Sequence, residues 1–471
     1  MITRSALSAP IVLDPAYGQL KEHLIELTGL AYYLDKDSDF AERISRRLSR
    51  VGLSDCDSYL RLLRDGANGE VELDELIAEL TIGETYFFRY REQFEALQYT
   101  VLPDLISRNQ NNRRLRIWSA GCATGAEAYS IAILLKREFF GSLAGWDVSI
   151  IGTDINRAFL SRARTGEFEE WAFRSTPDEL KWACFQRAGN RWVINPEYRE
   201  GVGFQYHNLV KHPFPSLVNN LSSFDLILCR NAMIYFSREI MRRLIAQFHH
   251  CLVDGGWLLV GHAEPSPELF TAFEIVNAPG TTLFRKGAGF VAPIGQTEFE
   301  PPSAWMESFR AVSSTPVIVP ARIPDERVAA PVEDAACAAP PQLSDVRLLA
   351  DRGQWENAAQ CSQKLLETDG LNPRAHFYYS LVLEQMGLHD EAERSLRRAV
   401  YLDRSFTLAH YYLGLVLQKK SDRRGAERSF ENVRTLVRKM DGSITFEDAH
   451  EITAHDLMRL TETHLEVLRR S

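Results

Sequence analysis

The sequence has little that would support a disulfide framework, a zinc site or a membrane span. Its seven cysteines are scattered over 471 residues, and no pair has the Cys-x-x-Cys spacing. We therefore expect free thiols in a reducing compartment. No apolar run approaches the length of a bilayer span, and the first residues lack the apolar core of a secretory signal. These absences predict a cytoplasmic protein without membrane insertion.

An excess of positive charge is also missing. The 63 acidic residues outnumber the 54 basic ones and give a net charge of −9. This weighs against nucleic acid as the main partner, because phosphate binding needs a basic surface. With 45% apolar and 25% charged residues, the composition is typical of soluble globular proteins. The length predicts two or three domains, since single cores stop growing well below it.

The hydrophobic pattern changes along the chain. Residues from about 17 to 80 are predicted to be helical, because apolar residues recur there at helical spacing. From 115 to 287 the runs RIWSA, VSIIGTD, FDLILCR and GWLLVGH indicate buried strands separated by helices. This alternation predicts an α/β fold with a doubly wound parallel sheet. FEIVNAPGTTLFRK predicts an antiparallel hairpin at one edge of that sheet.

The C-terminal third differs from both regions. Residues 288–342 are rich in Pro and Ala and are predicted to form a linker. Beyond it, GQWENA (353–358) is echoed by GLHDEA (387–392), which begins 34 residues later. This period resembles the tetratricopeptide repeat, so residues 343–471 are predicted to form an all-α solenoid. A helix near 447–469 would cap its last repeat.

A glycine-containing break follows the first predicted strand in LRIWSAGCATGAEAYS (115–130). A side chain at Gly121 or Gly125 would keep a ligand away from the backbone. The Gly-x-Gly-x-x-Gly dinucleotide fingerprint is missing. Glu127 would repel a pyrophosphate but suits an ammonium group, and Asp154 at the next strand end suits ribose hydroxyls. A ligand with these groups is S-adenosylmethionine; the plainer alternative is two turn glycines beside a helix-capping acid.

Five motifs, which occur in the same order as in a known enzyme family, indicate a resemblance to that family. They are TIGETYFFRYREQF (81–94), IWSAGCATGAEAYSIA (117–132), IGTDI (151–155), FDLILCRNAMIYF (224–236) and TTLFRK (281–286). Together they resemble the CheR-type protein-glutamate methyltransferases, which methylate chemoreceptors in chemosensory signalling. The resemblance implies an N-terminal helical receptor-docking domain (1–80) and a class I methyltransferase domain (81–287). It also implies a small β-subdomain inserted near 169–203.

The resemblance further implies S-adenosylmethionine as the methyl donor and roles for particular residues. Arg89 and Tyr235 would be catalytic and face the reacting carboxylate. The implied cofactor contacts are Thr85, Arg89, Gly121, Glu127, Asp154, Asn208, Leu209, Arg230 and Asn231. Taken alone, Arg89 could equally be a surface arginine and Tyr235 a core tyrosine. No metal ligand set is expected.

Two departures from the family pattern lead to expectations of their own. Gly83 stands where the family commonly has asparagine, which predicts weaker cofactor binding and tighter binding in Gly83→Asn. The segment AGNRWVIN (188–195) lacks the glycine-rich loop through which some members dock a receptor pentapeptide. We therefore expect no dependence on such a peptide.

The sequence indicates partner-binding surfaces less specifically than it indicates the cofactor site. Arg43, Arg46, Arg47 and Arg50 fall on one helical face. They form either an ordinary solvated face or a dock for the acidic helices of a chemoreceptor's cytoplasmic domain. The repeats would bind an unidentified protein or a second copy of the chain. For the whole chain, a lapsed methyltransferase acting as a scaffold and a methyltransferase for a non-protein substrate remain alternatives.

Overall fold

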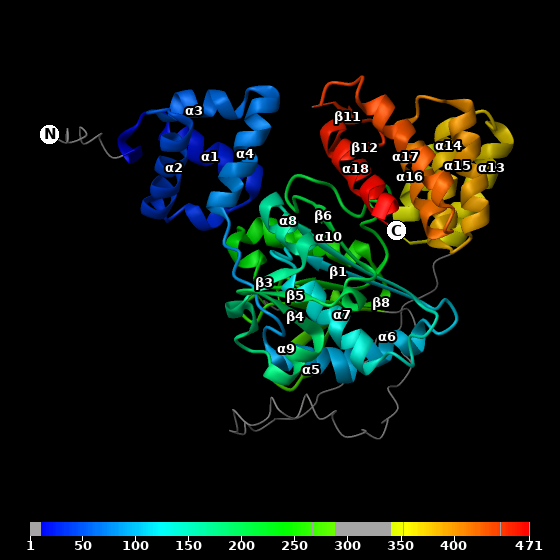
Figure 1. Ribbon diagram of the computed structural model, residues 1–471, viewed down its shortest axis with the longest axis horizontal. Coiled ribbons are helices and arrows are strands. Elements are labelled where there is room, and N and C mark those ends of the chain that lie inside the picture. Colours follow the sequence, from blue (N-terminus) through cyan, green and yellow to red (C-terminus); the bar gives the residue numbers. More distant parts are fainter. Residues whose placement is uncertain (1–10, 265–267, 288–340, 352, 443, 471) are drawn as a thin grey trace. The chain divides into compact units, whose positions relative to one another are not determined.

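The computed structural model describes residues 11–264, 268–287, 341–351, 353–442 and 444–470 (Figure 1). The predicted linker at 288–342 lies outside the described residues except for its last two positions. The chain divides into two compact units. The first contains the described residues up to 287, and the second contains most of the C-terminal helices.

The N-terminal region is helical, as predicted. Its elements are η1 (Ile11–Leu13), α1 (Tyr17–Thr28), η2 (Ala31–Tyr33), α2 (Asp37–Val51), α3 (Cys56–Leu63) and α4 (Gly66–Leu80). Both α1 and α2 end at a glycine in the left-handed conformation, with φ of 76° at Gly29 and 73° at Gly52. Such residues stop a helix without steric cost. Leu20, Phe40 and Tyr59 are fully or almost fully buried in the shared core.

A seven-stranded sheet forms the centre of the first unit. Its order is β6-β2-β1-β7-β8-β10-β9. In that order the strands are Val202–Tyr206, Asp147–Asp154, Arg114–Ala120, Phe224–Cys229, Leu252–Val260, Thr281–Lys286 and Phe273–Ala278. The first five strands pair in parallel, and β10 pairs antiparallel with both β8 and β9. The predicted strands, the parallel sheet and the edge hairpin are confirmed. Strand β6 was not anticipated, because VGFQY is short and only partly buried.

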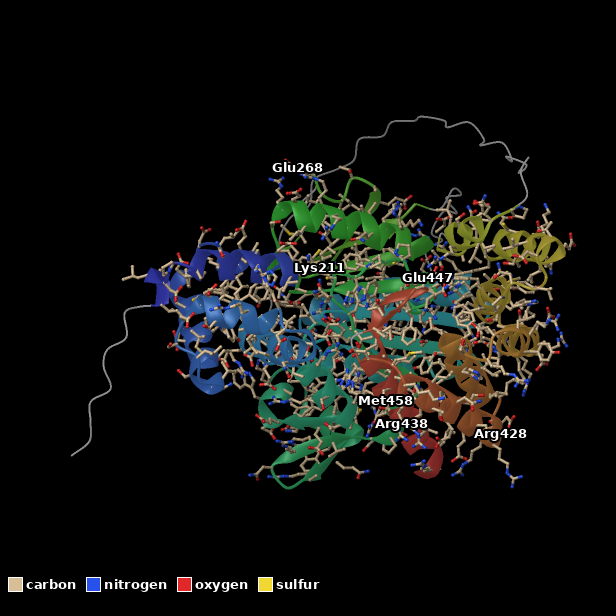
Figure 2. The ribbon with its side chains drawn as sticks, turned by 90° about the horizontal axis from the view of Figure 1, so that it is seen from above. Lys211, Glu268, Arg428, Arg438, Glu447 and Met458 are labelled. Carbon is tan, nitrogen blue, oxygen red and sulfur yellow. The ribbon has the colours of Figure 1, made fainter. Side chains whose placement is uncertain are left out.

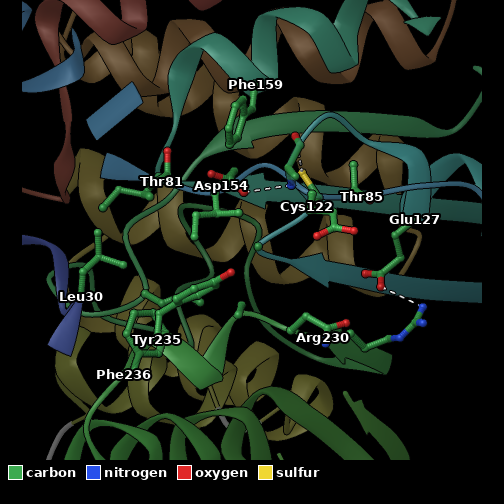
Figure 3. A pocket seen from close by; sticks show the side chains of 18 of the residues that line it. Leu30, Thr81, Thr85, Cys122, Glu127, Asp154, Phe159, Arg230, Tyr235 and Phe236 are labelled. Carbon is green, nitrogen blue, oxygen red and sulfur yellow. Dashed lines mark hydrogen bonds and ion pairs between the residues drawn. The ribbon is translucent and has the colours of Figure 1, made fainter. Parts of the chain in front are cut away.

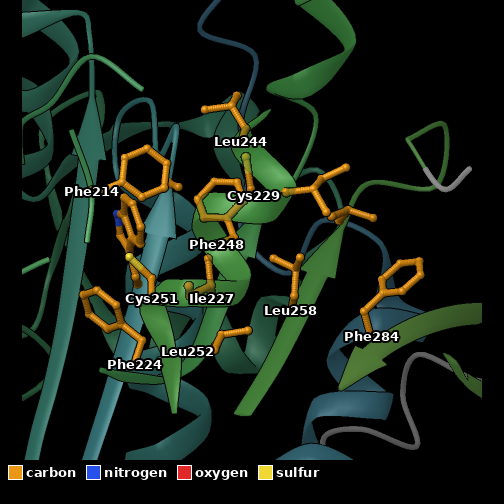
Figure 4. Packing of buried hydrophobic residues seen from close by; sticks show 14 of the residues in the cluster. Phe214, Phe224, Ile227, Cys229, Leu244, Phe248, Cys251, Leu252, Leu258 and Phe284 are labelled. Carbon is orange, nitrogen blue, oxygen red and sulfur yellow. The ribbon is translucent and has the colours of Figure 1, made fainter. Parts of the chain in front are cut away.

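Helices pack against this sheet and close its core. They are α5 (Arg91–Ala96), the π-helical turn η3 (Leu97–Val101), α6 (Leu102–Arg108), α7 (Ala126–Glu138), α8 (Arg157–Thr165) and α10 (Arg238–Cys251). Figure 4 shows the packing between the sheet and α10. The Trp118 ring lies 5.3 Å from Phe224 and 5.4 Å from Phe248, centroid to centroid. Burial of such aromatic rings supplies a large part of the stability of a core.

A small antiparallel sheet is inserted between α8 and β6. It contains β3 (Glu167–Glu169), β4 (Phe185–Ala188) and β5 (Arg191–Ile194), in the order β3-β5-β4. The turns η4 (Glu170–Phe173) and η5 (Pro196–Tyr198) and the helix α9 (Asp178–Cys184) complete this β-subdomain. Its strands β4 and β5 are joined by a tight turn with Gly189 at φ 63°. No long loop therefore separates these two strands.

The C-terminal helices repeat at a fixed spacing. They are α12 (Leu343–Asp351), α13 (Trp355–Thr368), α14 (Pro373–Gln385), α15 (His389–Leu402), α16 (Thr407–Lys419) and α17 (Arg423–Val437). Helices α13, α15 and α17 begin 34 residues apart, as do α14 and α16. The small residues Ala358, Ala392 and Ala426 recur with the same period and are fully buried. This is the tetratricopeptide-type arrangement that the period predicted.

The chain ends with a hairpin and a long helix. The hairpin pairs β11 (Thr445–Phe446) with β12 (Ala449–Thr453), and α18 follows at Ala454–Arg470. Within the second unit, the His464 ring of α18 stacks on Phe430 of α17 at 5.0 Å. Figure 2 shows the side chains on these elements. Among the described residues, no helix combines the length and hydropathy that a bilayer span requires.

Candidate active site

All ten residues predicted for the site line one cavity of the first unit (Figure 3). The cavity lies beyond the carboxyl ends of β1, β2 and β7, where parallel sheets of this kind bind ligands. Residues 28–33 of the N-terminal region and segment 81–89 contribute to its lining. The structure therefore brings together residues that are up to 150 positions apart, from Thr85 to Tyr235.

The glycine-containing turn after β1 adopts backbone angles that explain its composition. Gly121 has φ 77° and Gly125 has φ 86°, both in the left-handed region. A Cβ on Gly121 would lie 2.9 Å from Cβ of Ala232, so that position also has no room for a side chain. The backbone N–H of Ala123 donates to Oδ2 of Asp154 at 2.9 Å. This bond ties the turn to the end of β2.

Glu127 is oriented by two neighbours. Its Oε1 accepts a hydrogen bond from Ser119 Oγ at 2.6 Å, and its Oε2 forms an ion pair with Arg230 Nη1 at 3.1 Å. The Arg230 side chain is almost fully buried. Burial lowers the pKa of Arg230, whereas the Glu127 charge raises it. The carboxylate is thus fixed at the cavity wall, and each of its oxygens keeps capacity for a further donor such as an ammonium group.

Asp154 presents a second carboxylate at the end of β2. Its Oδ1 accepts from the backbone N–H of Asn156 at 2.8 Å, while Oδ2 accepts from Ala123. Burial raises the pKa of Asp154 to about 6, and the backbone hydrogen bonds oppose this rise. At neutral pH the group remains ionised and can accept hydrogen bonds from hydroxyl donors in the cavity.

The side chain of Asn208 is engaged within the protein. Its Nδ2 donates to the carbonyl of Leu27 at 2.8 Å, and its Oδ1 accepts from the backbone N–H of Val210 at 2.9 Å. Asn208 therefore joins the N-terminal helices to the segment that follows β6. Leu209 contributes an apolar surface to the cavity. Because Nδ2 carries two N–H groups, the amide can donate to a ligand while the bond to Leu27 remains.

Arg89 lies on a segment that is anchored at both sides. The backbone N–H of Phe87 donates to Ala172 of the β-subdomain at 2.9 Å, and that of Phe88 donates to Ser130 Oγ of α7 at 3.0 Å. Phe88 and Tyr90 have φ of 55° and 61°, so left-handed residues flank Arg89. Such conformations persist where the surroundings enforce them.

The guanidinium of Arg89 includes a buried donor without a partner. Its Nη1 donates to the carbonyl of Glu84 at 2.7 Å, and the group lies 5.2 Å from the Tyr90 ring centroid. Its Nε is buried and has no hydrogen-bond partner in the structure. A buried, unpaired donor costs free energy unless a ligand satisfies it. The cavity that Arg89 lines is the place from which an acceptor would come.

Tyr235 ends the turn η6 (Met233–Tyr235), which a buried carboxylate organises. Glu264 accepts hydrogen bonds from the backbone N–H groups of Asn231 at 3.1 Å, Met233 at 2.8 Å and Ile234 at 3.3 Å. Burial raises the pKa of Glu264. The sequence analysis missed Glu264, although an acidic residue directly after the apolar strand in WLLVGHAE was a signal for it.

The ring of Tyr235 also contacts the N-terminal region. It lies edge-on to Tyr32, with centroids 5.8 Å apart, and packs against the N-terminal core. Burial raises the pKa of Tyr235, so its hydroxyl remains a donor at neutral pH. Tyr32 was not among the predicted site residues, because nothing in its local sequence distinguishes it from Tyr33.

Two sequence-based expectations need correction. A Cβ on Gly83 would lie 2.8 Å from Cε1 and Cε2 of Phe159, so the position has no space for asparagine as the ring stands. The expectation of tighter binding in Gly83→Asn is therefore not supported. The predicted arginine face is only partly open, because its arginines contact residues of α4 and Arg47 is buried there.

The four arginines contact acidic residues of their own domain. Arg47 is buried, with 5% exposure, and donates to both oxygens of Glu72 at 3.0 and 2.7 Å. Arg43 bonds the backbone carbonyl of Glu79, and Arg46 and Arg50 pair with its carboxylate. Arg47 thus has a structural role. Arg46 and Arg50 remain half exposed or more.

No cluster of three or more His, Cys, Asp or Glu side chains with metal-binding geometry occurs among the described residues. The cavity instead fits a cationic nucleoside. It offers Glu127 to an ammonium group and Asp154 to hydroxyls, and its lining residues Arg89 and Asn231 each have a buried polar atom without a partner.

Comparison with known proteins decides the family. The CheR methyltransferase SAM-binding domain matches residues 83–281, and the CheR methyltransferase all-alpha domain matches residues 15–81. The chain belongs to the CheR methyltransferase family. Its methyl donor is S-adenosylmethionine. The fold that the resemblance implied, a helical domain followed by a class I methyltransferase sheet, is confirmed.

Relatives of known name lie in the same family. Chemotaxis protein methyltransferase 2 of Vibrio cholerae is 30% identical over 284 residues, covering 60% of this chain and 94% of the relative. The chemotaxis protein methyltransferase of Borreliella burgdorferi is 34% identical, with 47% and 78% covered. An uncharacterised 104.1 kDa protein of Rhodobacter capsulatus is 32% identical, but the chain spans only 27% of its length.

Solved structures that contain helical domains match about a quarter of the chain. PcrH bound to the chaperone binding region of PopD covers 27% of the chain at 17% identity and a TM-score of 0.24. The Arabidopsis OM64 TPR domain covers 26% at 13% identity and a TM-score of 0.22. The assignment of the repeats depends on the 34-residue spacing described above.

Proposed function

We propose that this chain transfers a methyl group from S-adenosylmethionine to glutamate side-chain carboxylates of chemoreceptor proteins and forms glutamyl methyl esters. Membership of the CheR family and the chemotaxis methyltransferases among its relatives support methylation in a chemosensory pathway. The observation that carries the finer assignment is the position of Arg89. Arg89 lines the same cavity as Glu127, Asp154 and Tyr235, and its guanidinium has a buried Nε without a partner.

The chemistry requires alignment and not a base. A glutamate side chain has a pKa near ~4.3, so at neutral pH it is already the nucleophile. When bound, the sulfonium cofactor supplies an electrophilic methyl group. Arg89 would hold one carboxylate oxygen through Nε and stay charged throughout. Tyr235 would donate a hydrogen bond that orients the other oxygen or the methyl donor.

The cavity walls contribute a second effect. The reacting carboxylate and the sulfonium carry opposite charges that disappear during transfer. A site that excludes water therefore favours the transition state over the charged reactants, and fixed geometry adds to the rate. Tyr32, Tyr90 and Phe236 supply aromatic surface around or beside the two catalytic side chains.

The domain roles are part of the same proposal. Residues 1–80 would dock the receptor, 81–287 would bind cofactor and perform transfer, and 343–471 would bind a further protein or a second copy. Within the N-terminal domain, the exposed parts of Arg46 and Arg50 are the cations that an acidic receptor helix would meet. Because both also pair with Glu79, such a helix would compete with that carboxylate.

The test uses the full chain, labelled S-adenosylmethionine and the cytoplasmic domain of a candidate receptor. We expect label on the receptor that mild base releases as methanol, because glutamyl methyl esters hydrolyse in base. Receptor variants with methylated glutamates changed to alanine should lose the label. Base-stable label, or binding of S-adenosylhomocysteine with no transfer to any receptor tested, would contradict the proposal and favour another substrate or a scaffold.

A further inference from the structure

Phe159 lies in the first turn of α8, five residues after Asp154, and lines the same cavity. Its backbone N–H donates to Oδ1 of Asn156 at 3.0 Å, which caps the helix and fixes the start of α8. Figure 3 shows its ring on the side of the cavity where Asp154 and Thr81 lie, away from the Glu127–Arg230 pair. The reaction described above uses no group on this aromatic ring.

The ring is held against a glycine. A Cβ built on Gly83 would lie 2.8 Å from two carbons of the Phe159 ring, closer than real Cβ atoms approach. Gly83 is not in the left-handed region, so its backbone would accept alanine without strain. Glycine is therefore required here for space alone.

A hydrogen bond keeps these two segments together. Asn156 Nδ2 donates to Thr81 Oγ1 at 2.7 Å, so the start of α8 is tied to the chain two residues before Gly83. Asn156 is fully buried, and its backbone N–H also bonds Oδ1 of Asp154. One residue thus sets the positions of Gly83, the Phe159 ring and the Asp154 carboxylate relative to one another.

We propose that Phe159 is a cofactor-binding residue that contacts the nucleoside part of S-adenosylmethionine, and that Gly83 is needed to keep its ring in that place. The ring lies on the side of the carboxylate suited to ribose hydroxyls and offers an apolar surface to the nucleoside. Aromatic walls with a few oriented polar groups are the usual construction of such pockets. The proposal deepens the cofactor assignment and is independent of the acceptor.

The geometry implies coupling between the two positions. Alanine at 83 would push the ring into the cavity, and leucine at 159 would remove the aromatic surface. With leucine at 159, the methyl group at 83 has space, so the two losses should not add. Non-additivity of this kind is expected for residues in contact and not for distant ones.

Calorimetric titration of the full chain with S-adenosylhomocysteine tests this. We expect Phe159→Leu to weaken binding about tenfold and Gly83→Ala about fivefold, each corresponding to the loss of one aromatic contact. The double variant should bind about as well as Phe159→Leu alone. Gly203→Ala, in open space at an ordinary φ, and Phe140→Leu, at an exposed ring, are the matched controls and should bind like wild type.

A second probe locates the contact. Binding of 5′-methylthioadenosine, which has the nucleoside without the amino acid, should fall by the same factor in Phe159→Leu. Wild-type affinity in Phe159→Leu, or losses that add in the double variant, would overturn the proposal. A wild-type chain that binds S-adenosylhomocysteine but methylates no receptor would overturn the proposed function and leave this inference intact.

Discussion

Arg230 and Glu127 form an ion pair at 3.1 Å in which the arginine is almost completely buried and the carboxylate faces the cavity. The pair joins the end of β7 to the first turn of α7, and Arg230 also bonds the backbone carbonyl of Arg89. One guanidinium therefore orients both the carboxylate proposed to bind the cofactor's ammonium group and the segment that carries Arg89, the arginine proposed as catalytic.

The Glu127 carboxylate can be tested by an isosteric change. We expect Glu127→Gln to weaken S-adenosylhomocysteine binding by about ten- to a hundredfold, because a charge-assisted hydrogen bond is replaced by a neutral one. Glu239→Gln, also in the first turn of a helix but exposed, is the matched control and should bind normally. Equal affinities for both variants in calorimetry would remove Glu127 from the cofactor site.

Binding should depend on pH through Asp154. Burial raises its pKa to about 6 in the free protein. Since ribose hydroxyls donate to the ionised form, S-adenosylhomocysteine affinity should fall as pH drops below 6, by up to about tenfold per unit. Calorimetry between pH 5 and 8 would show this fall, and Asp154→Asn should bind weakly and lose this part of the pH dependence.

The Asp154 carboxyl group should give the stability of the ligand-free protein the opposite pH dependence. A raised carboxyl pKa means that the folded state holds its proton more tightly than the unfolded chain. The stabilisation is complete below the usual aspartate pKa and disappears as pH rises through about 6. The free energy of unfolding of ligand-free wild type should therefore fall relative to that of Asp154→Asn as pH rises from about 4 to 7, whatever the constant cost of turning an amide N–H₂ toward a backbone donor. A difference between the two proteins that does not change with pH would contradict the raised pKa.

Glu264 should affect turnover more than cofactor affinity. Replacing it with glutamine places an amide N–H₂ near backbone N–H donors, which should loosen η6 and displace Tyr235. We expect at least about a tenfold lower kcat in Glu264→Gln, with S-adenosylhomocysteine affinity changed by less than about threefold. Glu268→Gln, at an exposed glutamate that pairs with Arg238, controls for charge. A normal kcat in Glu264→Gln would argue against this positioning role.

The buried arginine of α2 should matter for folding. Arg47→Met leaves Glu72 buried without its partner, so the free energy of unfolding should fall by about 3 kcal/mol or more. Arg46→Met removes pairs in which the arginine is half exposed, and Arg50 still pairs with Glu79, so the free energy of unfolding should fall by less than about 1 kcal/mol. Urea unfolding followed by fluorescence would compare the two variants. Similar losses of unfolding free energy in the two variants would show that the buried Arg47 contributes no more to stability than Arg46.

Parts of the site could be predicted from local sequence, because the positions of these residues follow from where individual strands and helices begin and end. Gly121 and Gly125 follow a strand, Glu127 opens a helix and Asp154 ends the next strand, so parallel pairing alone brings them to one edge. Arg89 and Tyr235 came from family motifs, and the structure places both at the same cavity. Their catalytic roles remain predictions, and Glu264→Gln addresses the positioning of Tyr235.

Other features depend on packing between distant segments, and sequence spacing carries no information about them. The arginine face of α2 could be described from helical period, but only the position of α4 shows that Glu72 and Glu79 are its partners. Likewise, only the fold shows that the amide of Asn208 donates to the carbonyl of Leu27, 181 residues away.

The sequence by itself determined the order of helices and strands, the parallel sheet and the 34-residue repeat, because hydrophobic period and glycine placement act over a few residues. Only the tertiary structure decided which charges are neutralised inside the protein and which donors stay free, as with Arg47 and Arg89. It also decided that Gly83 must be small, since the ring that fills its space comes from a helix 76 residues further along the chain. Electrostatic and steric fit depend on contacts in space, and these exist only once the chain has folded.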